Sequence, residues 1–487
     1  MISSVSKWSI GAVLALFTLS SQAQKKKAVS PAENLKTQAI QDLQGRYDQY
    51  KTIALQIWDN AEVGYKEKKS SALLQETLKN NGFTVEAGVA EIPTAFVATY
   101  GSGKPVIGIL AEFDALPGLS QQAVPEKKTA GKDAGHGCGH HLFGTASVAA
   151  GIEIKKMIEE KKLTGTVKVY GCPAEEGGSG KVYMVRAGLF NDVDIALHWH
   201  PGAENGVTMT SALANSSAKF RFRGLSAHAA GAPERGRSSL DAVEAMNYMV
   251  NMMREHVPQE TRIHYVITNG GKAPNVVPDY AEVYYYVRHP KRDQVKQIFD
   301  RVVKAGQAAA MGTETTMEYE IIGGTHDLLL NKSLGELMQK NLEKVGGVQY
   351  TPEEVEFAKK IQSTYNYTVP AISYSDSIAP FKIEADAGGG STDVGDVSYA
   401  VPTVGLRAST WVPGTPAHSW QAVACGGTEI GTKGMMVAAK TIALTAIDLY
   451  LDPTAIEKAK IEYKKMLGDY KYEALLGTRK PALNYRD

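Results

Sequence analysis

Strand-like and helix-like segments alternate along most of this chain, and the alternation limits the fold more than any other feature. The segments 93–101, 105–113, 166–173 and 193–201 are apolar and typical of buried strands, whereas TASVAAGIEIKKMIEEKK (145–162) is typical of a helix. Strands interleaved with helices predict an α/β fold whose sheet carries helices on its faces. Functional loops are then expected at the strand ends.

A second pattern interrupts the first over residues 216–323. This region is predicted to run strand, helix, strand, strand, helix, strand, the βαββαβ order of a ferredoxin-like sandwich. The α/β pattern then resumes, so we predict a small domain inserted into a larger one formed by residues 24–215 and 324–487. Residues 32–80 carry apolar side chains at three- and four-residue spacings and are predicted to be helical. Two domains suit 487 residues, because single cores stop growing at roughly 250–300 residues.

Residues 1–23 have the features of a secretory signal peptide. Lys7 precedes an apolar run from Trp8 to Leu19, and small residues at Ser21 and Ala23 fit cleavage after Ala23. The run is shorter than the about 20 residues that a membrane-spanning helix needs. We therefore expect an exported protein, either periplasmic or secreted. The 53 basic and 52 acidic residues nearly cancel without a cationic stripe, which argues against a nucleic acid partner.

The stretch GHGCGHH, Gly135 to His141, places one cysteine among three histidines in a glycine-rich loop. The thiol of Cys138 could serve as a nucleophile, a redox group or a metal ligand. Only three cysteines are present and none forms a CxxC pair, so a disulfide framework is excluded and a redox role lacks its usual partner thiol. Cys172 and Cys425 are expected to be small buried apolar residues.

Four further segments carry metal-ligand or acid–base residue types at predicted strand ends. They are EFDALPG (112–118), CPAEEGG (172–178), HWHPG (198–202) and TPAHSW (415–420). Taken singly, each has an ordinary structural explanation, such as a capped turn, a solvated loop or a core histidine. Taken together they indicate a metal site, because the adjacent charges of Glu175 and Glu176 at one strand end are costly unless a cation compensates them.

A thiolate, imidazoles and a carboxylate together suit zinc or a similar divalent ion such as manganese or cobalt. Cys138 and His140, two residues apart, would lie on one side of an extended segment. The candidate ligands are more than one tetrahedral ion needs, which favours two ions roughly 3.5–4 Å apart. These candidates are Cys138, His140, Glu176, His198 and His418.

In this order, the motifs EFDALP, GHGCGH, PAEE, HWHP and PAHSW resemble the dinuclear aminoacylase and carboxypeptidase family of metallopeptidases, in particular its amidohydrolase branch. The resemblance extends over essentially the whole mature chain. It implies metal ligation by the five candidates above, Glu175 as the general base and Asp114 as the residue that orients a ligand. The inserted region corresponds to the family's lid and dimerisation domain.

In that lid, the resemblance implies that His228, in LSAHAA, helps to stabilise the oxyanion from the partner subunit. Asn275 and Arg288 match positions that hold the carbonyl and carboxylate oxygens of the substrate. A homodimer through the lid is expected, or a heteromer with a related subunit. His141 departs from the family pattern, since an acidic or amide residue follows Cys-Gly-His in much of the branch. His141 is expected to be a residue behind the ligands, an extra polar contact or a packed residue rather than a ligand, and His200 is expected to shape the pocket wall or pack beneath it.

The expected reaction is hydrolysis of the amide bond of an N-acyl or N-aroyl amino acid, with p-aminobenzoyl-glutamate as the first substrate to test. Two cations would lower the pKa of a bridging water to about 7, and the resulting hydroxide would attack the amide carbonyl. Glu175 would take the proton and return it to the leaving amine. Arg288, with its planar fork, suits a free carboxylate.

Alternative functions stay open from the sequence. A dipeptidase, a carboxypeptidase or an N-acyl-amino-acid deacylase would use the same site. A catalytically silent protein that binds amino-acid derivatives belongs to another class, and the presence of a general base at Glu175 argues against it. A thiol hydrolase would use Cys138 as nucleophile and His140 as base, and would leave Glu176, His198 and His418 without a role.

Overall fold

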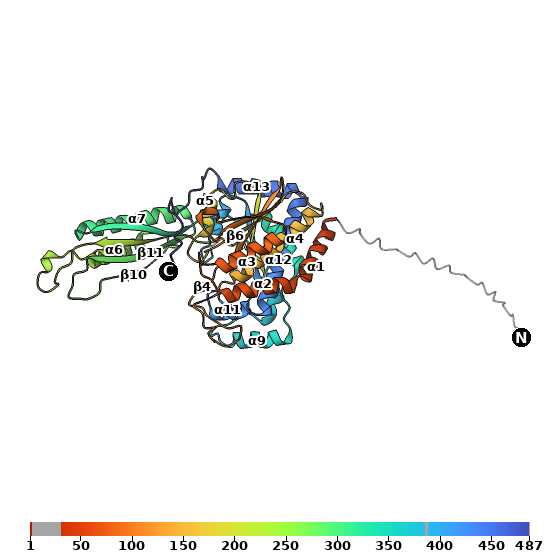
Figure 1. Ribbon diagram of the computed structural model, residues 1–487, viewed down its shortest axis with the longest axis horizontal. Coiled ribbons are helices and arrows are strands. Elements are labelled where there is room, and N and C mark those ends of the chain that lie inside the picture. The colour runs from red at the N-terminus through yellow and green to blue at the C-terminus, as the bar shows by residue number, and fades with distance from the viewer. Residues whose placement is uncertain (2–30, 385–387, 487) are drawn as a thin grey trace.

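The computed structural model describes Met1 and residues 31–384 and 388–486, so the predicted signal peptide lies outside the described residues. Figure 1 shows a large body built around one twisted sheet and a smaller unit that projects from one side of it. The smaller unit, which we call the lid, runs from β9 to β12, and the chain enters and leaves it at its junction with the body. The body and the lid correspond to the α/β domain and the inserted domain that the sequence predicts.

The body contains a seven-stranded mixed sheet in the order β1-β2-β6-β3-β7-β13-β8. Its four inner strands β6, β3, β7 and β13 are parallel, and the outer strands pair antiparallel. Parallel strands carry their carboxyl ends to one edge of the sheet, which is where loops can converge on a ligand. The strands are β1 (Thr84–Ala87), β2 (Phe96–Gly101), β3 (Val106–Glu112), β6 (Thr166–Cys172), β7 (Ile195–Gly202), β8 (Gly206–Val207) and β13 (Thr403–Ser409).

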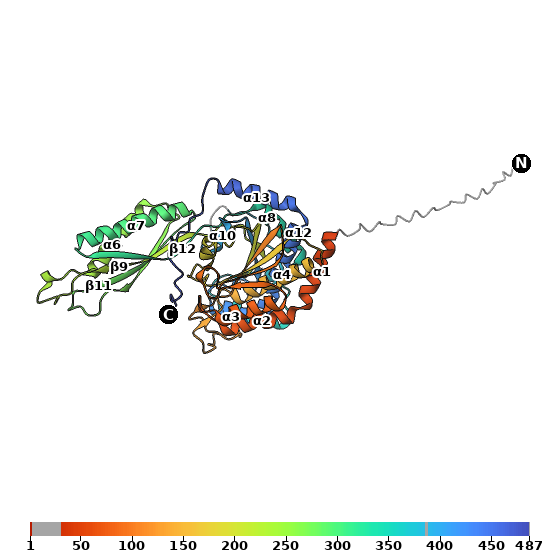
Figure 2. The same cartoon turned by 45° about the horizontal axis from the view of Figure 1, so that its top comes forward.

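Helices cover both faces of this sheet (Figure 2). The central helices on one face are α4 and α12, which pack against each other and against the parallel strands. β4 (Leu116–Pro117) pairs antiparallel with β5 (Ala134–Gly135), and residues 118–133 connect the two strands. The body helices are α1 (Pro31–Gly45), α2 (Tyr47–Asn60), α3 (Lys68–Asn80), α4 (His140–Glu159), α5 (Gly180–Arg186), α8 (Lys332–Val345), α9 (Pro352–Gln362), α10 (Val394–Ser398), α11 (Trp420–Gly426), α12 (Glu429–Leu451) and α13 (Pro453–Leu467), with 3-10 turns η1 (Val89–Glu91) and η4 (Ile372–Asp376).

Among the described residues, α12 is the one helix long and apolar enough to cross a membrane. Its apolar window is 83% buried inside the protein, where it packs against α4, α1 and α8. This burial is the behaviour of the core helix of a folded domain.

The helical region predicted over residues 32–80 is divided into three helices rather than one. The break between α2 and α3 follows Ala61, which caps α2 in the left-handed conformation with φ of 45°. Tyr65 also has a positive φ, of 64°. At Gly64 a Cβ atom would lie 2.2 Å from the Tyr485 hydroxyl oxygen, so this loop is shaped by a segment from the other end of the chain. Helical periodicity does not report such a contact.

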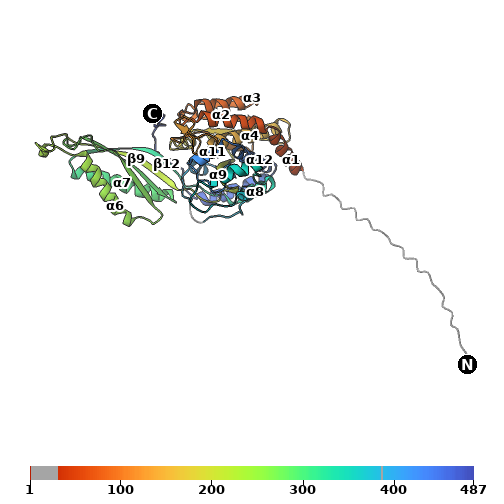
Figure 3. The ribbon, with the colours of Figure 1, turned by 90° about the horizontal axis from the view of Figure 1, so that it is seen from below.

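The lid has the predicted βαββαβ order. Its antiparallel sheet has the order β10-β11-β9-β12, and both long helices pack on one face of it (Figure 3). β9 and β12 extend beyond the predicted limits of 216 and 323 by two residues each. The elements are β9 (Ala214–Arg223), η2 (Pro233–Arg235), α6 (Ser239–Met253), η3 (Arg254–His256), β10 (Arg262–Asn269), β11 (Tyr280–His289), α7 (Arg292–Gly312) and β12 (Thr316–Thr325).

Residues 468–486, which we call the C-terminal tail, connect the lid with the body. After α13 the tail runs past the base of the lid, where Arg479 donates hydrogen bonds to the carbonyl oxygens of Ile321 and Ile322 in β12. Arg186 of α5 donates to the carbonyl oxygen of Gly477 at 2.8 Å. The tail then ends between the lid and the body, as Figure 1 shows.

Candidate active site

The predicted site segments meet at the carboxyl edge of the parallel strands. β3 ends at Glu112 and β6 ends at Cys172, where the segments EFDALPG and CPAEEGG begin, and HWHPG forms the last five residues of β7. The segment around His418 follows β13 and lies before α11. Because neighbouring parallel strands place these ends side by side, residues more than 300 positions apart lie in one cluster.

GHGCGHH is a sharp turn into α4 and not an extended segment, which corrects the prediction. Gly139 is left-handed, with φ of 77°, and His140 is the first residue of the helix. A Cβ atom at Gly139 would lie 2.6 Å from the Cβ of Pro201, so the turn also needs a residue without a side chain. The His140 ring therefore lies near the Cys138 sulfur because the chain turns at Gly139 into the helix, and not because the two residues share one side of a strand.

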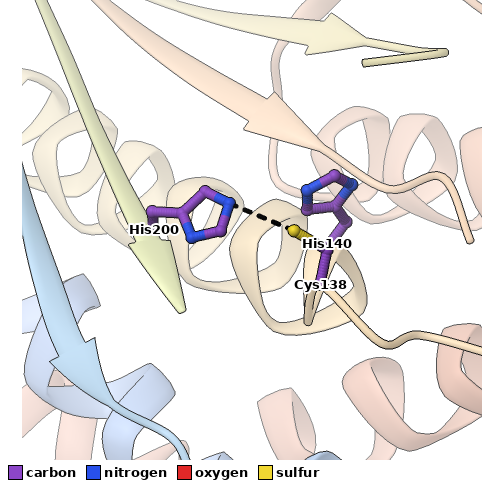
Figure 4. Close-up of side chains that lie close together, drawn as sticks. All are labelled: Cys138, His140 and His200. Atoms are coloured by element: carbon purple, nitrogen blue, oxygen red, sulfur yellow. Dashed lines mark hydrogen bonds between the residues drawn. The ribbon is translucent and has the colours of Figure 1, made fainter. Parts of the chain in front are cut away.

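Cys138, His140 and His200 form the first group of potential metal ligands (Figure 4). One ligand atom from each residue lies within 4.8 Å of the others, and His200 Nε2 is 3.4 Å from the Cys138 sulfur. The group combines one thiol with two imidazoles from separate parts of the chain. This donor set is typical of a zinc-like site.

The hydrogen bonds at Nδ1 of His140 and His200 leave the lone pair of each ring on Nε2, the atom nearer this group. His140 Nδ1 donates to Asp114 Oδ1 at 2.9 Å, and His200 Nδ1 donates to the Pro201 carbonyl oxygen at 2.7 Å. A neutral imidazole that donates from Nδ1 carries its lone pair on Nε2. Both rings are therefore fixed in the tautomer that a metal ion requires, and Asp114 orients His140 in the manner of carboxylate–histidine–metal arrangements.

Cys138 also belongs to a second group, with Glu176 and His418. His418 Nε2 is 3.2 Å from Glu176 Oε1, and the His418 backbone N–H donates to the Gly137 carbonyl oxygen at 2.9 Å. His418 is held with φ of 58°, and its side chain is 54% exposed. The loop after β13 is thus tied to the cysteine loop, and the Cys138 sulfur belongs to both groups of ligands.

A third group contains Glu112, His140 and Glu175. Glu112 Oε2 and His140 Nε2 are 3.2 Å apart, and neither of these buried atoms has a hydrogen bond partner among the described residues. Glu175, half-buried beside them, lies on the loop that also carries Glu176. Burial and the charges of Glu112 and Glu176 raise the pKa of the Glu175 carboxyl well above its usual range.

The structure does not bring His198 to any of these ligand groups, and His200 lies there instead. His198 precedes His200 by two residues on β7, about 6.6 Å along a strand, so its side chain lies deeper in the body. Its ring packs on Gly405 of β13, where a Cβ atom would lie 2.3 Å from the ring atoms. Burial and the charge of Lys181 lower the pKa of His198 to about 3. The sequence predicts His198 as a ligand and His200 as a residue of the pocket wall, whereas in the structure the ring of His200 is the one that lies beside Cys138 and His140.

A buried lysine that the sequence reasoning missed lies under the site. Lys181 Nζ is 2.6 Å from Glu112 Oε1 and 2.6 Å from Asp393 Oδ1, and all three side chains are at most 1% exposed. The Lys181 backbone N–H also donates to Asp393 at 2.9 Å. Lys181 neutralises part of the acidic charge beneath Glu175 and fixes Glu112 next to His140. The isolated lysine in GGSGK gave no signal of this role.

The electrostatics of the cluster favour a bound cation. Burial raises the pKa of the Cys138 thiol well above its usual range, although His140 opposes the shift. Burial would lower the pKa of His140, but the charges of Cys138, Asp114 and Glu112 raise it well above its usual range. Without a cation, the cluster therefore retains protons on groups that a metal ion would displace. The donor atoms and the unpaired Nε2 and carboxylate oxygens fit one or more divalent ions.

Other polar residues near the site have structural partners. His141 Nε2 donates to the Gly426 carbonyl oxygen at 3.0 Å and faces away from the ligand groups, in line with the predicted packing role. His136 Nε2 donates to the Ile57 carbonyl oxygen at 3.1 Å. All three cysteines are free and buried, and Cys172 and Cys425 lie in the core, as predicted.

None of the three predicted lid residues belongs to the ligand groups of this chain. His228 and Asn275 lie on neighbouring exposed segments of the lid, and Ala229 N–H donates to the Asn275 carbonyl oxygen at 3.0 Å. Arg288, near the end of β11, lies at the base of the lid, and its guanidinium carbon is 5.3 Å from the centre of the Tyr286 ring. A role for His228 at the site therefore needs a second subunit.

Comparison with known proteins agrees with these features. Residues 214–313 match a family model described as the peptidase dimerisation domain. The chain is 43% identical to a subunit of the p-aminobenzoyl-glutamate hydrolase of Escherichia coli (strain K12) over 450 residues, which cover 87% of this chain and 93% of that protein. It is 27% identical to the Xaa-Arg dipeptidase of Mus musculus over 463 residues, 92% and 95% of the two chains.

A solved structure shares the fold. A dinuclear metal-binding peptidase of the M20 family from Bacillus subtilis superimposes with a TM-score of 0.57 at 14% identity, covering 84% of this chain and 99% of that one. At this coverage the superposition includes residues of both the body and the lid.

Proposed function

The chain belongs to the M20 family of metal-dependent hydrolases, and we propose that it hydrolyses the amide bond of N-acyl or N-aroyl amino acids, with p-aminobenzoyl-glutamate as its substrate. The identity of 43% along nearly the whole of the Escherichia coli hydrolase chain supports this substrate. The products would be p-aminobenzoate and glutamate.

One observation carries the proposal: two ligand groups share the Cys138 sulfur. His140 and His200 form one group with it, and Glu176 and His418 form the other. A single tetrahedral ion binds four ligands, and these five residues are more than it needs, whereas two divalent ions could be held by the whole set. We therefore propose two divalent ions, of zinc, manganese or cobalt, held by Cys138, His140, His200, Glu176 and His418.

Each of the site residues then has a separate role in amide hydrolysis. Divalent ions at this site would supply the Lewis acidity that polarises the amide carbonyl and acidifies water. Glu175 takes the proton of the attacking water and delivers it to the leaving nitrogen, the usual action of a positioned carboxylate. Asp114 holds His140, and Lys181 holds Glu112 beside it. Arg288 binds the free carboxylate of the amino-acid product.

Lid residues complete the site in an assembly of two chains. His228 and Asn275 are exposed in a lid that matches the peptidase dimerisation domain. We propose that a second copy, or a related subunit, places His228 where it stabilises the oxyanion. Export with cleavage after Ala23, to the periplasm or the medium, is part of the same proposal.

The test pairs two histidine variants with metal analysis. Purified, metal-reconstituted protein should contain about two ions per chain, and His200→Ala should lose at least one of them. The matched control, His198→Ala, should keep both. Equal metal content in both variants, or less than one ion in the wild type, would contradict the proposed ligand set.

Activity is measured on the same samples. Wild-type protein should release p-aminobenzoate from p-aminobenzoyl-glutamate, and Glu175→Gln should keep its metal while losing at least about 100-fold in kcat. A Cys138 thioester trapped with substrate, in protein from which metal has been removed without loss of activity, would instead establish a thiol hydrolase.

A dipeptidase is the second candidate, because the full-length likeness to the Xaa-Arg dipeptidase covers 92% of this chain. Dipeptides with a C-terminal arginine are assayed beside p-aminobenzoyl-glutamate. A higher kcat/KM for those dipeptides would select this alternative.

A further inference from the structure

The C-terminal tail brings a second arginine to the edge of the candidate site. Arg486 donates a hydrogen bond from Nη2 to the carbonyl oxygen of Glu176, and Tyr485 donates to the same oxygen at 3.1 Å. A Cβ atom at Gly177 would lie 3.8 Å from Arg486 Nη2. The guanidinium therefore lies against the loop that carries Glu175 and Glu176.

Arg486 has more hydrogen bond donors than partners. Its Nε atom is buried and has no hydrogen bond partner in the part of the chain that the structure describes, and its guanidinium carbon lies 4.7 Å from the centre of the Tyr485 ring. It forms no ion pair with any residue within 31–384 or 388–486. A partly buried guanidinium without an anion is costly, and the cost is recovered when a carboxylate binds.

Arg288, on the lid, also has a guanidinium nitrogen without a partner in the described part of the chain. Its Nε atom is also buried without a hydrogen bond partner among the described residues. Tyr284, Tyr286 and Arg288 alternate along β11 and so share one face of the lid sheet, whereas Tyr285 points into the helix-covered core. The face that carries Arg288 is thus the one without helices.

A short row of polar groups runs from Arg288 toward the segment that follows Glu176. The Tyr284 hydroxyl donates to the Tyr286 hydroxyl at 3.1 Å, and the Arg288 guanidinium carbon lies 5.3 Å from the Tyr286 ring centre. At the other end of the row, the Tyr284 hydroxyl lies 3.5 Å from Ser217 Oγ. A Cβ atom at Gly323 would lie 3.0 Å from Ser217 Oγ and 3.9 Å from Ser179 Oγ, three residues after Glu176. The face of the lid that carries Arg288 therefore meets the loop against which Arg486 lies.

We infer that Arg486 is a specificity-determining residue that binds the side-chain carboxylate of an acidic C-terminal residue, while Arg288 binds its α-carboxylate. The inference rests on the proposed function, and it explains why a substrate ending in glutamate would be preferred over one ending in a neutral residue. Two planar forks are the arrangement that recognises a dicarboxylate in two places.

The test compares substrates that differ only in the charge of the side chain. Arg486→Gln should lower kcat/KM for p-aminobenzoyl-glutamate roughly 10- to 100-fold, and should change kcat/KM for p-aminobenzoyl-glutamine less than about threefold. Arg486→Lys should retain part of the preference for glutamate. Arg479→Gln is the matched control, because this tail arginine contacts lid backbone and Glu320 rather than the Glu176 loop.

Equal losses on both substrates in Arg486→Gln would mean that this residue only anchors the tail, and would overturn the inference. If wild-type protein hydrolyses neither substrate, the proposed function fails, and the inference is then decided by binding. Calorimetric titration of metal-reconstituted protein with L-glutamate and L-glutamine should show tighter glutamate binding that Arg486→Gln abolishes. Equal affinity for the two amino acids in wild type would contradict it.

Discussion

Replacing Lys181 by methionine should destabilise the body more than most substitutions in this chain. Methionine has similar length but no charge, so Glu112 and Asp393 would lose the ammonium group that lies 2.6 Å from each of them. Both carboxylates are at most 1% exposed, so water cannot replace the lost partner. Removing one partner of a buried ion pair costs about 3–5 kcal/mol, and we expect Lys181→Met to fall in this range.

The cause of this loss can be isolated with a second substitution. If the unpaired carboxylates are responsible, Lys181→Met combined with Asp393→Asn should be more stable than Lys181→Met alone, because one of the two buried charges is gone. Asparagine keeps an oxygen that can accept from the backbone N–H of residue 181. The surface control is Lys104→Met, whose ammonium group is 3.1 Å from Asp194 but 62% exposed, and which should cost less than about 1 kcal/mol.

Tryptophan fluorescence during urea unfolding is a suitable assay, because every tryptophan in the described residues belongs to the body and none to the lid. These are Trp58, Trp199, Trp411 and Trp420. The unfolding midpoint then reports on the domain that contains Lys181. A midpoint for Lys181→Met equal to that of Lys104→Met, or a double variant less stable than the single one, would refute the reasoning.

Two further substitutions test the energetics away from the ligands. Burial, together with the charge of Asp42, raises the pKa of Glu153 from 4.5 to about 7. Between these two pH values the folded protein holds a proton on Glu153 that the unfolded chain has lost. The free energy of unfolding should therefore fall by about 3 kcal/mol as the pH rises from 4.5 to 7. Glu153→Gln should remove this decrease in urea unfolding at pH 5 and pH 8, and an unchanged pH dependence would contradict it. Gly405→Ala should lower the free energy of unfolding by about 1–3 kcal/mol, because the added methyl group clashes with His198. The control Gly312→Ala, whose added Cβ would have no atom within 4 Å, should not destabilise the chain. Equal melting temperatures in the two variants would show that the His198 ring can move.

The general architecture could be predicted because it depends on short-range patterns. The order of elements in the lid and the apolar strands of the body are encoded in local periodicity, and the structure has both. The convergence of the EFDALPG, GHGCGHH, PAEE and PAHSW segments follows from parallel strand ends sharing one edge. Local patterns therefore placed Cys138, His140, Glu176 and His418 in one cluster.

Features that depend on depth or on distant contacts could not be predicted. His198 and His200 share one face of β7, and alternation cannot tell which of them reaches the end of the strand. Lys181 is a single charge in a glycine-rich loop, and its two partners lie 69 and 212 positions away. The shape of the loop between α2 and α3 and the position of Arg486 both depend on the tail, whose last turns carry no periodicity.

The two ends of the lid lie next to each other, and this has a consequence for how the body folds. Asn215 and Thr325 are paired across β9 and β12, whereas β13 pairs with β7 through Thr403 and Ala196, about 200 residues apart. If the lid folds early, its two ends are held together, and the loop between β7 and β13 that remains to be closed is about half as long. Closure entropy changes by only about 0.6 kcal/mol for each doubling of loop length, so the gain is modest in stability. The shorter loop mainly raises the rate at which β7 and β13 come into contact during folding. A destabilised lid should therefore slow the refolding of the body and the recovery of metal binding together.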